Sequence, residues 1–193
     1  TFAHQKKAGV IPRDALLTPR PAELPAWDSL TPKQKRTSAR LMELYAAFLA
    51  HTDAQVGRLR DALKEMGQYD NTLFVYIVGD NGASAEGGLL GSSNYLGDLQ
   101  GLQSNLASFA DDPQALLGEH SYAHYNSGWA WATDTPFQWT KQVASHLGGT
   151  RNPMVLAWPA RIRDRGGLRQ QFGHVNDIVP TILEAAGIAA PAS

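Results

Sequence analysis

An apolar run that ends in a short polar turn constrains this sequence more than any other stretch. The run Thr72–Val78 is rich in β-branched and aromatic side chains, and Gly79, Asp80, Asn81 and Gly82 follow it. Such a run is typical of a strand buried on both faces of a parallel sheet. Because ligands of open α/β sheets bind outside the carboxyl ends of the strands, Asp80 and Asn81 mark a candidate site. The same letters also fit a plain turn that binds nothing, and this stretch alone leaves both interpretations open.

Length and composition limit the kinds of fold, partner and cysteine chemistry that this chain can have. A chain of 193 residues can bury a core as one sizeable domain. Its net charge of -1 gives no reason to expect nucleic acid or an anionic membrane as a partner. No apolar run approaches the roughly 20 residues that span a bilayer. The sequence has no cysteine, which excludes disulfides, zinc–thiolate sites and a cysteine nucleophile within these residues.

The first third of the chain predicts an extended segment followed by one long helix. Residues 1–30 contain scattered prolines and little periodicity, so we expect an extended segment there. Thr31 precedes Pro32, a pattern typical of a helix start, and an apolar stripe at three- and four-residue steps follows. The predicted helix runs from about Lys33 to Met66 and stops at Gly67. Helix, short turn and buried strand together form half of a βαβ unit.

The rest of the chain predicts a long loop, a second strand and a final helix. The region from Gly82 to Thr135 lacks periodicity apart from short helices expected at Leu99–Leu106 and Pro113–Leu117. Met154–Trp158 predicts another buried strand, and Asp177 is expected to cap a helix that ends at Gly187. We therefore expect an α/β fold with a mixed, largely parallel sheet flanked by helices. The chain begins with Thr1, not Met, and shows no strand before the helix, so we expect an incomplete domain from a longer protein.

The end of the long loop is dense in aromatic and imidazole groups. Aromatic side chains on a loop at the rim of a sheet often line a substrate pocket, which makes His124, Trp129 and Trp131 candidate substrate contacts. The alternative, that the aromatic groups cover a hydrophobic edge, stays open. His120 and His124 alone offer too few ligands for zinc.

Three further side chains carry chemistry. Asp80 and Asn81 offer a carboxylate and an amide oxygen, ligands that suit Ca²⁺ or Mg²⁺ better than zinc. Two such ligands do not complete a calcium site, which needs six to eight oxygens. Lys141 precedes a Gly-Gly pair, and its ammonium could neutralise charge that develops on a leaving oxygen.

The order of these motifs resembles a known family. An apolar strand, Gly-Asp-Asn-Gly, a long loop, a lysine, Gly-Gly-Thr-Arg-Asn-Pro, a short strand ending in Trp-Pro and His-Val-Asn-Asp-Ile follow one another. Together they look like the C-terminal part of the catalytic region of type I sulfatases, close to bacterial arylsulfatases of the alkaline phosphatase superfamily. The likeness covers nearly the whole chain, so residues 1–193 are interpreted as a single partial catalytic domain.

The resemblance implies specific roles. Asp80 and Asn81 match the pair that ligates the active-site Ca²⁺, with Mg²⁺ as another possibility, and Lys141 matches a lysine that contacts the sulfate ester. The implied substrate is a small-molecule sulfate ester, in the cytoplasm or periplasm of a bacterium, with the oligomeric state open. The family's nucleophile is a formylglycine made within a Cys/Ser-x-Pro-x-Arg motif. No such motif occurs here, so we expect the nucleophile outside this chain and the isolated chain to be inactive.

Two competing interpretations remain at this point. A phosphatase or phosphodiesterase of the same superfamily typically has Asp-His at the matching strand end, whereas Asn81 favours a single hard cation and therefore sulfate esters. A non-catalytic fragment that binds a cation or a partner protein is favoured by the missing nucleophile motif. The coding sequence upstream of Thr1 would separate these interpretations.

Overall fold

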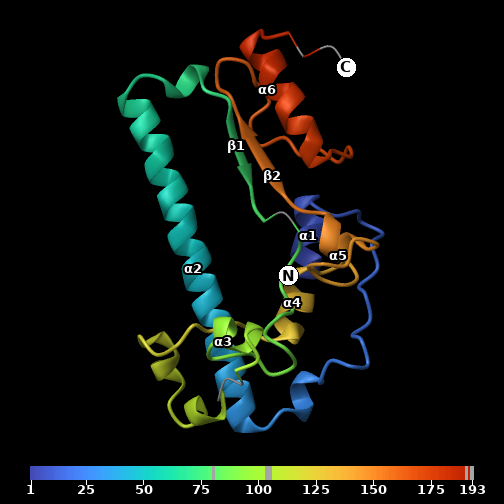
Figure 1. Cartoon of the computed structure of the whole chain (residues 1–193). Helices are drawn as coiled ribbons and strands as arrows, with labels where there is room; N and C mark the ends of the chain where they lie inside the picture. The colour runs from blue at the N-terminus through green and yellow to red at the C-terminus, as the bar shows by residue number, and fades with distance from the viewer. Residues whose placement is uncertain (80, 103–105, 190, 192–193) are drawn as a thin grey trace.

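The computed structural model describes residues 1–79, 81–102, 106–189 and 191. Figure 1 shows the long helix α2 along one side of the molecule and the two strands, with α6 beside them, along the other. In the same view α3 lies beside the first half of α2, and α1, α4 and α5 lie below the two strands. In chain order the helices and strands are α1 (Phe2–Ala8), α2 (Pro32–Glu65), β1 (Phe74–Ile77), α3 (Tyr95–Leu99), α4 (Ser127–Thr133), α5 (Leu147–Thr150), β2 (Met154–Ala157) and α6 (Ile178–Ala186).

The predicted long helix is confirmed as α2. Thr31 and Gln34 form a capping box, in which the Thr31 hydroxyl accepts from the Gln34 N–H at 3.3 Å and the Gln34 side chain accepts from the Thr31 N–H at 2.9 Å. This reciprocal pairing satisfies two backbone donors that the first helical turn leaves without partners. Gly67, with a φ of 67°, lies just past the end of the helix, as the sequence predicted.

The two predicted strands form at the expected places but pair differently. β1 and β2 are antiparallel, with Phe74 opposite Ala157 and Ile77 opposite Met154. The prediction of a largely parallel sheet is therefore not confirmed, because the described residues contain only this two-stranded pair. β1 is also not buried on both faces, since Ile77 is 40% exposed. β2 is also open to solvent, since Met154, Val155 and Leu156 are between 44% and 54% exposed.

The N-terminal segment differs from the expectation of an extended chain. Phe2–Ala8 forms the helix α1, which ends at Gly9 in a left-handed conformation with a φ of 75°. The prolines that favoured an extended segment begin only at Pro12, so they do not oppose a helix before it. The prediction was wrong for Phe2–Ala8 because it extended to these residues a conformation that the prolines favour only from Pro12 onward.

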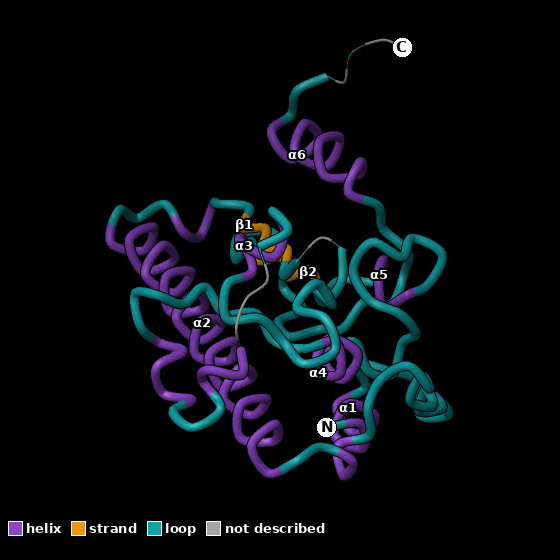
Figure 2. The backbone as a smooth tube through the Cα atoms, turned by 60° about the horizontal axis from the view of Figure 1, so that its bottom comes forward, coloured by secondary structure: helices purple, strands orange, loops and turns teal. Residues whose placement is uncertain are grey.

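The buried core lies between α2 and the end of the long loop. Leu41, Leu116, Tyr125 and Ala130 are buried together, and Leu44, Phe109 and Trp129 pack against them in part. Figure 2 shows the loops that connect α2 with α4 and shows α6 set apart from the other helices. The short helix predicted at Pro113–Leu117 is confirmed as a 3-10 helix that brings Leu116 into this core. The helix predicted at Leu99–Leu106 is replaced by α3 and a 3-10 turn at Leu106–Phe109, and residues 103–105 of that prediction lie outside the described residues.

The last helix is confirmed, with Asp177 at its N-cap position. α6 ends before Gly187, which has a φ of 70°. The Asp177 carboxylate accepts a hydrogen bond from the His174 N–H at 2.7 Å and so closes the preceding 3-10 turn rather than the first turn of α6. Asp177 thus holds the predicted N-cap position of α6, but its side chain bonds the turn before that helix.

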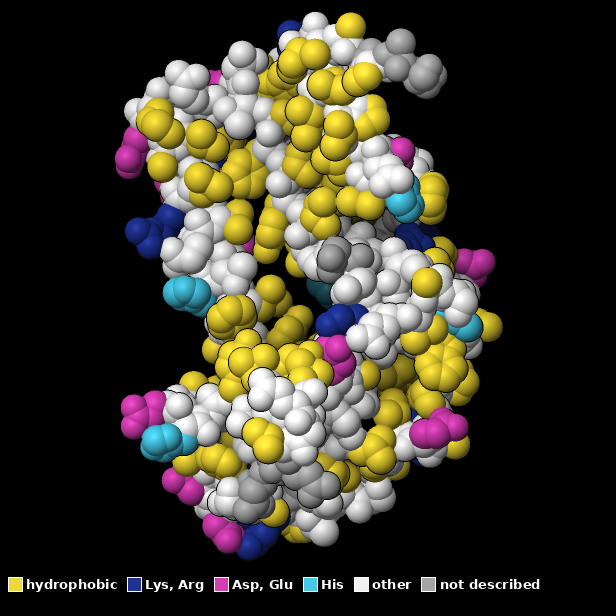
Figure 3. Space-filling model, in the orientation of Figure 1, with side chains coloured by type: hydrophobic (Ala, Val, Ile, Leu, Met, Phe, Trp, Pro, Cys, Tyr) yellow, Lys and Arg dark blue, Asp and Glu magenta, His cyan; other side chains and the backbone are white. Residues whose placement is uncertain are grey.

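Hydrophobic side chains gather around an open hollow. Figure 3 shows them over the strands, α6 and the facing part of α2. A hollow of about 760 Å³ lies where the end of α2 meets β2. Its lining includes Lys64, Tyr69, Leu156 and Trp158. Among the described residues no helix is both long enough and apolar enough to span a membrane.

Candidate active site

The loop after β1 is held in place by three other segments. Gly82 donates its N–H to Oδ1 of Asn152 at 2.9 Å, just before β2. Ala83 donates its N–H to the Asp134 carboxylate at 3.1 Å, just after α4, and accepts from the N–H of Lys141 at 2.9 Å. Asn81 is exposed at the start of this loop. Asn81, a candidate cation ligand, therefore begins a loop that is hydrogen-bonded to the backbone of Lys141.

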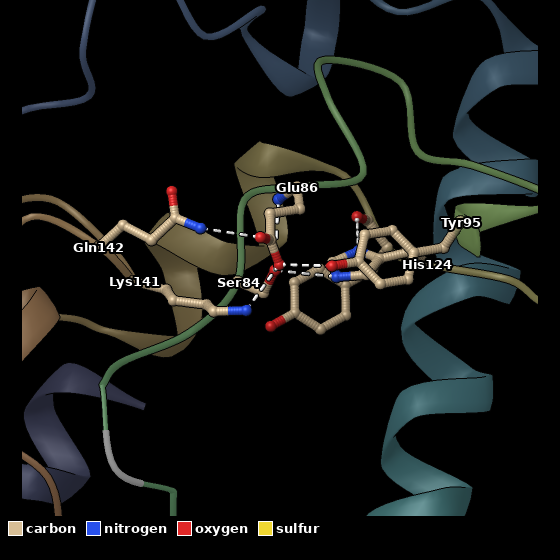
Figure 4. A network of polar contacts seen from close by, with 7 residues as sticks. Ser84, Glu86, Tyr95, His124, Lys141 and Gln142 are labelled. Atoms are coloured by element: carbon tan, nitrogen blue, oxygen red, sulfur yellow. Dashed lines mark hydrogen bonds and ion pairs between the residues drawn. The ribbon is translucent and has the colours of Figure 1, made fainter. Parts of the chain in front are cut away.

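Lys141 makes an ion pair with a carboxylate that the sequence did not single out. Its Nζ lies 2.7 Å from Oε2 of Glu86, and the two side chains are 27% and 22% exposed. Figure 4 shows Lys141 and Gln142 approaching Glu86 from one side and Tyr95 from the other, with His124 beside Tyr95 and Ser84 at the centre of the group. A partly buried pair of this kind is screened less by solvent than a surface ion pair.

Glu86 collects several hydrogen-bond donors. Oε2 accepts from the hydroxyls of Ser84 at 2.7 Å and Tyr95 at 2.8 Å, and Oε1 accepts from the side-chain amide of Gln142 at 2.9 Å. The hydrogen bond from Lys141, followed by those from Ser84 and Tyr95, lowers the pKa of Glu86 from 4.5 to about 2. The same contact raises the pKa of Tyr95, because its hydroxyl donates to an anion. Glu86 is therefore a carboxylate at neutral pH.

His124 lies in the same network. Its Nδ1 is 2.8 Å from the carbonyl oxygen of Tyr125, which can only accept, so Nδ1 carries the proton of this contact. Its Nε2 is 3.0 Å from the Ser84 hydroxyl, and its ring lies 4.9 Å from the ring of Tyr95. Two hydrogen bonds between the backbones of Ser92 and His124, each 2.9 Å long, fix the position of this residue. His124, a predicted substrate contact, therefore lies next to the Ser84 hydroxyl. That hydroxyl donates to Glu86, the carboxylate that pairs with Lys141.

The two candidate tryptophans lie on α4. Trp129 donates its indole N–H to the carbonyl oxygen of Ser38 on α2 at 2.9 Å, and its ring lies 5.7 Å from the ring of Trp27. Trp131 is half-buried, and its carbonyl oxygen accepts from the Thr135 hydroxyl at 3.5 Å. The contacts of Trp129 attach α4 to α2. A role of either ring in substrate binding stays a prediction.

Two titratable groups near the loop have shifted pKa values. Burial raises the pKa of Asp134 from 3.8 to about 6, and the hydrogen bond from Ala83 opposes this shift. Burial, with the neighbouring Tyr45, raises the pKa of Tyr125 to about 12. Asp134 therefore changes charge within the range of pH in which enzymes commonly work.

The candidate cation ligands suit a hard cation by the type of their donor atoms. Asp80 and Asn81 supply oxygen donors of the kind that calcium prefers, and Asp80 lies outside the described residues. Within the described part of the chain, no three histidine, aspartate or glutamate side chains come close enough to hold a metal ion together. A complete cation site would need further ligands beside this pair.

Sequence reasoning missed several residues of this site. Glu86 pairs with the Lys141 ammonium, Ser84 and Tyr95 donate to Glu86, and Asp134 and Asn152 hold the loop. Glu86 and Lys141 are 55 residues apart in a region without helical or strand periodicity, so no spacing rule joins them. The one available signal was a carboxylate followed by Gly87 and Gly88, shortly after the Asp-Asn pair.

Comparison with known proteins places this site in context. A family model described as Sulfatase matches residues 16–188. The chain is 35% identical over 191 residues to the uncharacterized sulfatase PB10D8.02c of Schizosaccharomyces pombe, covering 97% of this chain and 32% of that protein. It is 31% identical over 189 residues to an arylsulfatase of Klebsiella aerogenes, covering 97% of this chain and 38% of the relative. The uncharacterized sulfatase YdeN of Escherichia coli is 26% identical over 171 residues, covering 89% of this chain and 22% of that protein. The chain thus spans about a third of the length of the first two relatives.

Proposed function

The chain belongs to the sulfatase family, and on that premise we propose that it forms part of a sulfuric ester hydrolase of arylsulfatase type. The substrate is a small-molecule sulfate ester. The observation that supports this proposal is the placement of Lys141, whose backbone is bonded to the loop that follows Asn81 and whose ammonium is paired with Glu86.

Each candidate residue has a distinct task in this proposal. The Lys141 ammonium stabilises negative charge on the ester oxygens as the sulfur–oxygen bond breaks. Asp80 and Asn81 would hold a calcium ion, which when bound supplies positive charge to the sulfate group. His124, Trp129 and Trp131 contact the organic group of the ester, for which aromatic and imidazole rings offer apolar area.

The nucleophile in this proposal is a formylglycine outside these residues. The chain contains neither cysteine nor a Ser-x-Pro-x-Arg sequence, and it matches about a third of the arylsulfatase of Klebsiella aerogenes. The isolated 193-residue chain is therefore expected to leave aryl sulfates intact. The enzyme to test is the full-length protein that carries these residues.

The test compares Lys141→Met with Lys33→Met in the full-length protein. Lys33 is a suitable control because it is also ion-paired, to Asp111, but on the exposed surface of α2. With p-nitrophenyl sulfate we expect Lys141→Met to lower kcat/KM by about 100-fold or more, as loss of a group that stabilises the transition state does. Lys33→Met should keep the rate of the unmodified protein.

Several outcomes would overturn the proposal. Faster turnover of p-nitrophenyl phosphate than of the sulfate would favour the phosphatase interpretation. A coding sequence without a Cys/Ser-x-Pro-x-Arg motif would favour a non-catalytic protein. Calcium that binds an Asp80→Ala/Asn81→Ala variant as tightly as the unmodified protein would remove the cation site.

A further inference from the structure

The Glu86 carboxylate is the point at which separate parts of the chain meet. Ser84 is on its own loop, Tyr95 begins α3, and Lys141 and Gln142 belong to the segment before α5. Four donors on two carboxylate oxygens occupy nearly all of its capacity to accept hydrogen bonds. The orientation of this side chain is therefore set by its surroundings rather than by its own rotamer preferences.

The loop that carries Glu86 is itself tightly packed. A Cβ added to Gly87 would lie 2.1 Å from the carbonyl oxygen of Tyr125 and 2.8 Å from Nδ1 of His124. Only glycine fits this close approach, which brings the loop against the His124 segment. Gly91, further along the same loop, packs closely against the core, since a Cβ there would lie 2.3 Å from the Leu41 side chain.

The segment that carries Lys141 is arranged around the same carboxylate. Gln142 has a φ of 74°, a left-handed conformation that a non-glycine residue adopts only when its surroundings impose it. In this conformation the side chains of Lys141 and Gln142, although adjacent in sequence, both reach Glu86. The backbone N–H of Lys141 is bonded to Ala83, so both ends of the residue are fixed.

We propose that Glu86 is a positioning residue for Lys141, and that Ser84, Tyr95 and Gln142 hold its carboxylate so that the ammonium stays correctly placed. The inference rests on the proposed function, in which the Lys141 ammonium contacts the sulfate ester. A simple surface ion pair contributes little to stability and needs no such framework. Here Ser84, Tyr95 and Gln142 donate hydrogen bonds to the Glu86 carboxylate. Lys141 is the cation that pairs with it.

The proposal predicts that Glu86 acts only through Lys141. In the full-length protein, Glu86→Gln keeps the size of the side chain but removes its charge. We expect it to lower kcat/KM for p-nitrophenyl sulfate by about tenfold, the lower part of the range for residues that orient a functional group. In the Lys141→Met background the same substitution should have no further effect, because the group that it positions is absent.

Two readouts separate positioning from a structural role. The alkaline limb of the pH profile of kcat/KM should move to lower pH in Glu86→Gln, since an anion no longer stabilises the ammonium. Glu86→Asp keeps the charge, so its alkaline limb should stay in place. Independently of activity, acetic anhydride should modify Lys141 faster in Glu86→Gln, as measured by peptide mass spectrometry, while Lys33 reacts at an unchanged rate.

The outcomes distinguish this inference from the proposed function. If Lys141→Met leaves sulfate hydrolysis unchanged, the role of Lys141 in the proposed function is wrong, whereas the labelling result still tests the pairing. If Lys141→Met is inactive and Glu86→Gln keeps the rate, the pH profile and the labelling of the unmodified protein, the positioning role alone is wrong. Additive losses in the double variant would also overturn it, because they would show an effect of Glu86 that bypasses Lys141.

Discussion

The backbone N–H of Gly82 donates a hydrogen bond to Oδ1 of Asn152 over 2.9 Å, which joins the loop after β1 to the residue just before Pro153 and β2. The two loops also touch directly, since a Cβ at Gly82 would lie 2.0 Å from the carbonyl oxygen of Gly148. The antiparallel pairing of β1 and β2 therefore brings Asn81 and the Gly-Gly-Thr-Arg-Asn-Pro segment together.

We expect Asn152→Ala to lower the free energy of unfolding by about 1 kcal/mol, since one partly buried backbone donor loses its partner. Asn152→Asp keeps an acceptor at this position and should lose less. Urea denaturation of both variants measures the difference. Equal stability of Asn152→Ala and the unmodified chain would contradict the prediction.

Gly148→Ala should destabilise the chain by about 2 kcal/mol or more, because an added Cβ forces backbone movement in a tightly packed turn. That Cβ would lie 1.9 Å from the carbonyl oxygen of Trp139 and 2.4 Å from that of Gln138. Gly57→Ala is the matched control. Gly57 lies within α2 with no atom near the added methyl group, so this substitution should stabilise the chain by about 0.5 to 1 kcal/mol. A similar change in melting temperature for both variants would refute the steric argument.

Asp134 should make stability depend on pH. Its pKa is raised from 3.8 to about 6, so its contribution to stability is fully present below 3.8 and is lost as the pH rises through about 6. Asp134→Asn keeps an acceptor for the Ala83 N–H and removes the titration. At alkaline pH this variant should be more stable by about 1 to 2 kcal/mol, a figure reduced from the full shift because the group is only half-buried. Denaturation across the acid-to-alkaline range measures the slope, and the exposed Asp53→Asn should leave it unchanged.

Asn126 should contribute to stability through both ends of its amide. Its Oδ1 caps α4 by accepting from the Trp129 N–H at 3.0 Å, and its Nδ2 donates to the buried Ser38 hydroxyl at 2.6 Å. Asn126→Ala loses the cap and leaves Ser38 without this donor, so we expect a loss of about 2 to 3 kcal/mol. Asn126→Ser can still cap the helix and should lose about half as much. If the two variants unfold at the same denaturant concentration, capping contributes nothing here.

The sequence could predict those parts of the fold that local signals determine. The start of α2 at Thr31, its stop at Gly67 and the end of α6 at Gly187 follow from capping residues, which act within one helical turn. The positions of β1 and β2 follow from apolar runs. Their antiparallel register does not, because it depends on the path of the chain between them.

The candidate site divides in the same way. Lys141 and Asn81 could be proposed from motifs, and what each contacts could not. Glu86 and Lys141 are 55 residues apart, and Asp134 and Ala83 are 51 residues apart. The loops between them contain glycines that allow close approach, but they show no periodic sequence pattern. Contacts of this kind are fixed by tertiary packing, which leaves no trace in the spacing of residues along the chain.

The burial of α2 is confined to one end, and this has a mechanical consequence. Its buried residues all lie between Thr37 and Leu41, although the helix continues to Glu65. At 1.5 Å per residue the remaining part is a rod of about 36 Å, so a tilt of about 10° at the anchored end moves the far end by about 6 Å. The turn after that far end is linked to the residues that follow β2, because Ala160 donates its N–H to the carbonyl oxygen of Asp70 at 2.8 Å. A tilt of α2 at its buried part would therefore be passed to the strand pair through this backbone hydrogen bond.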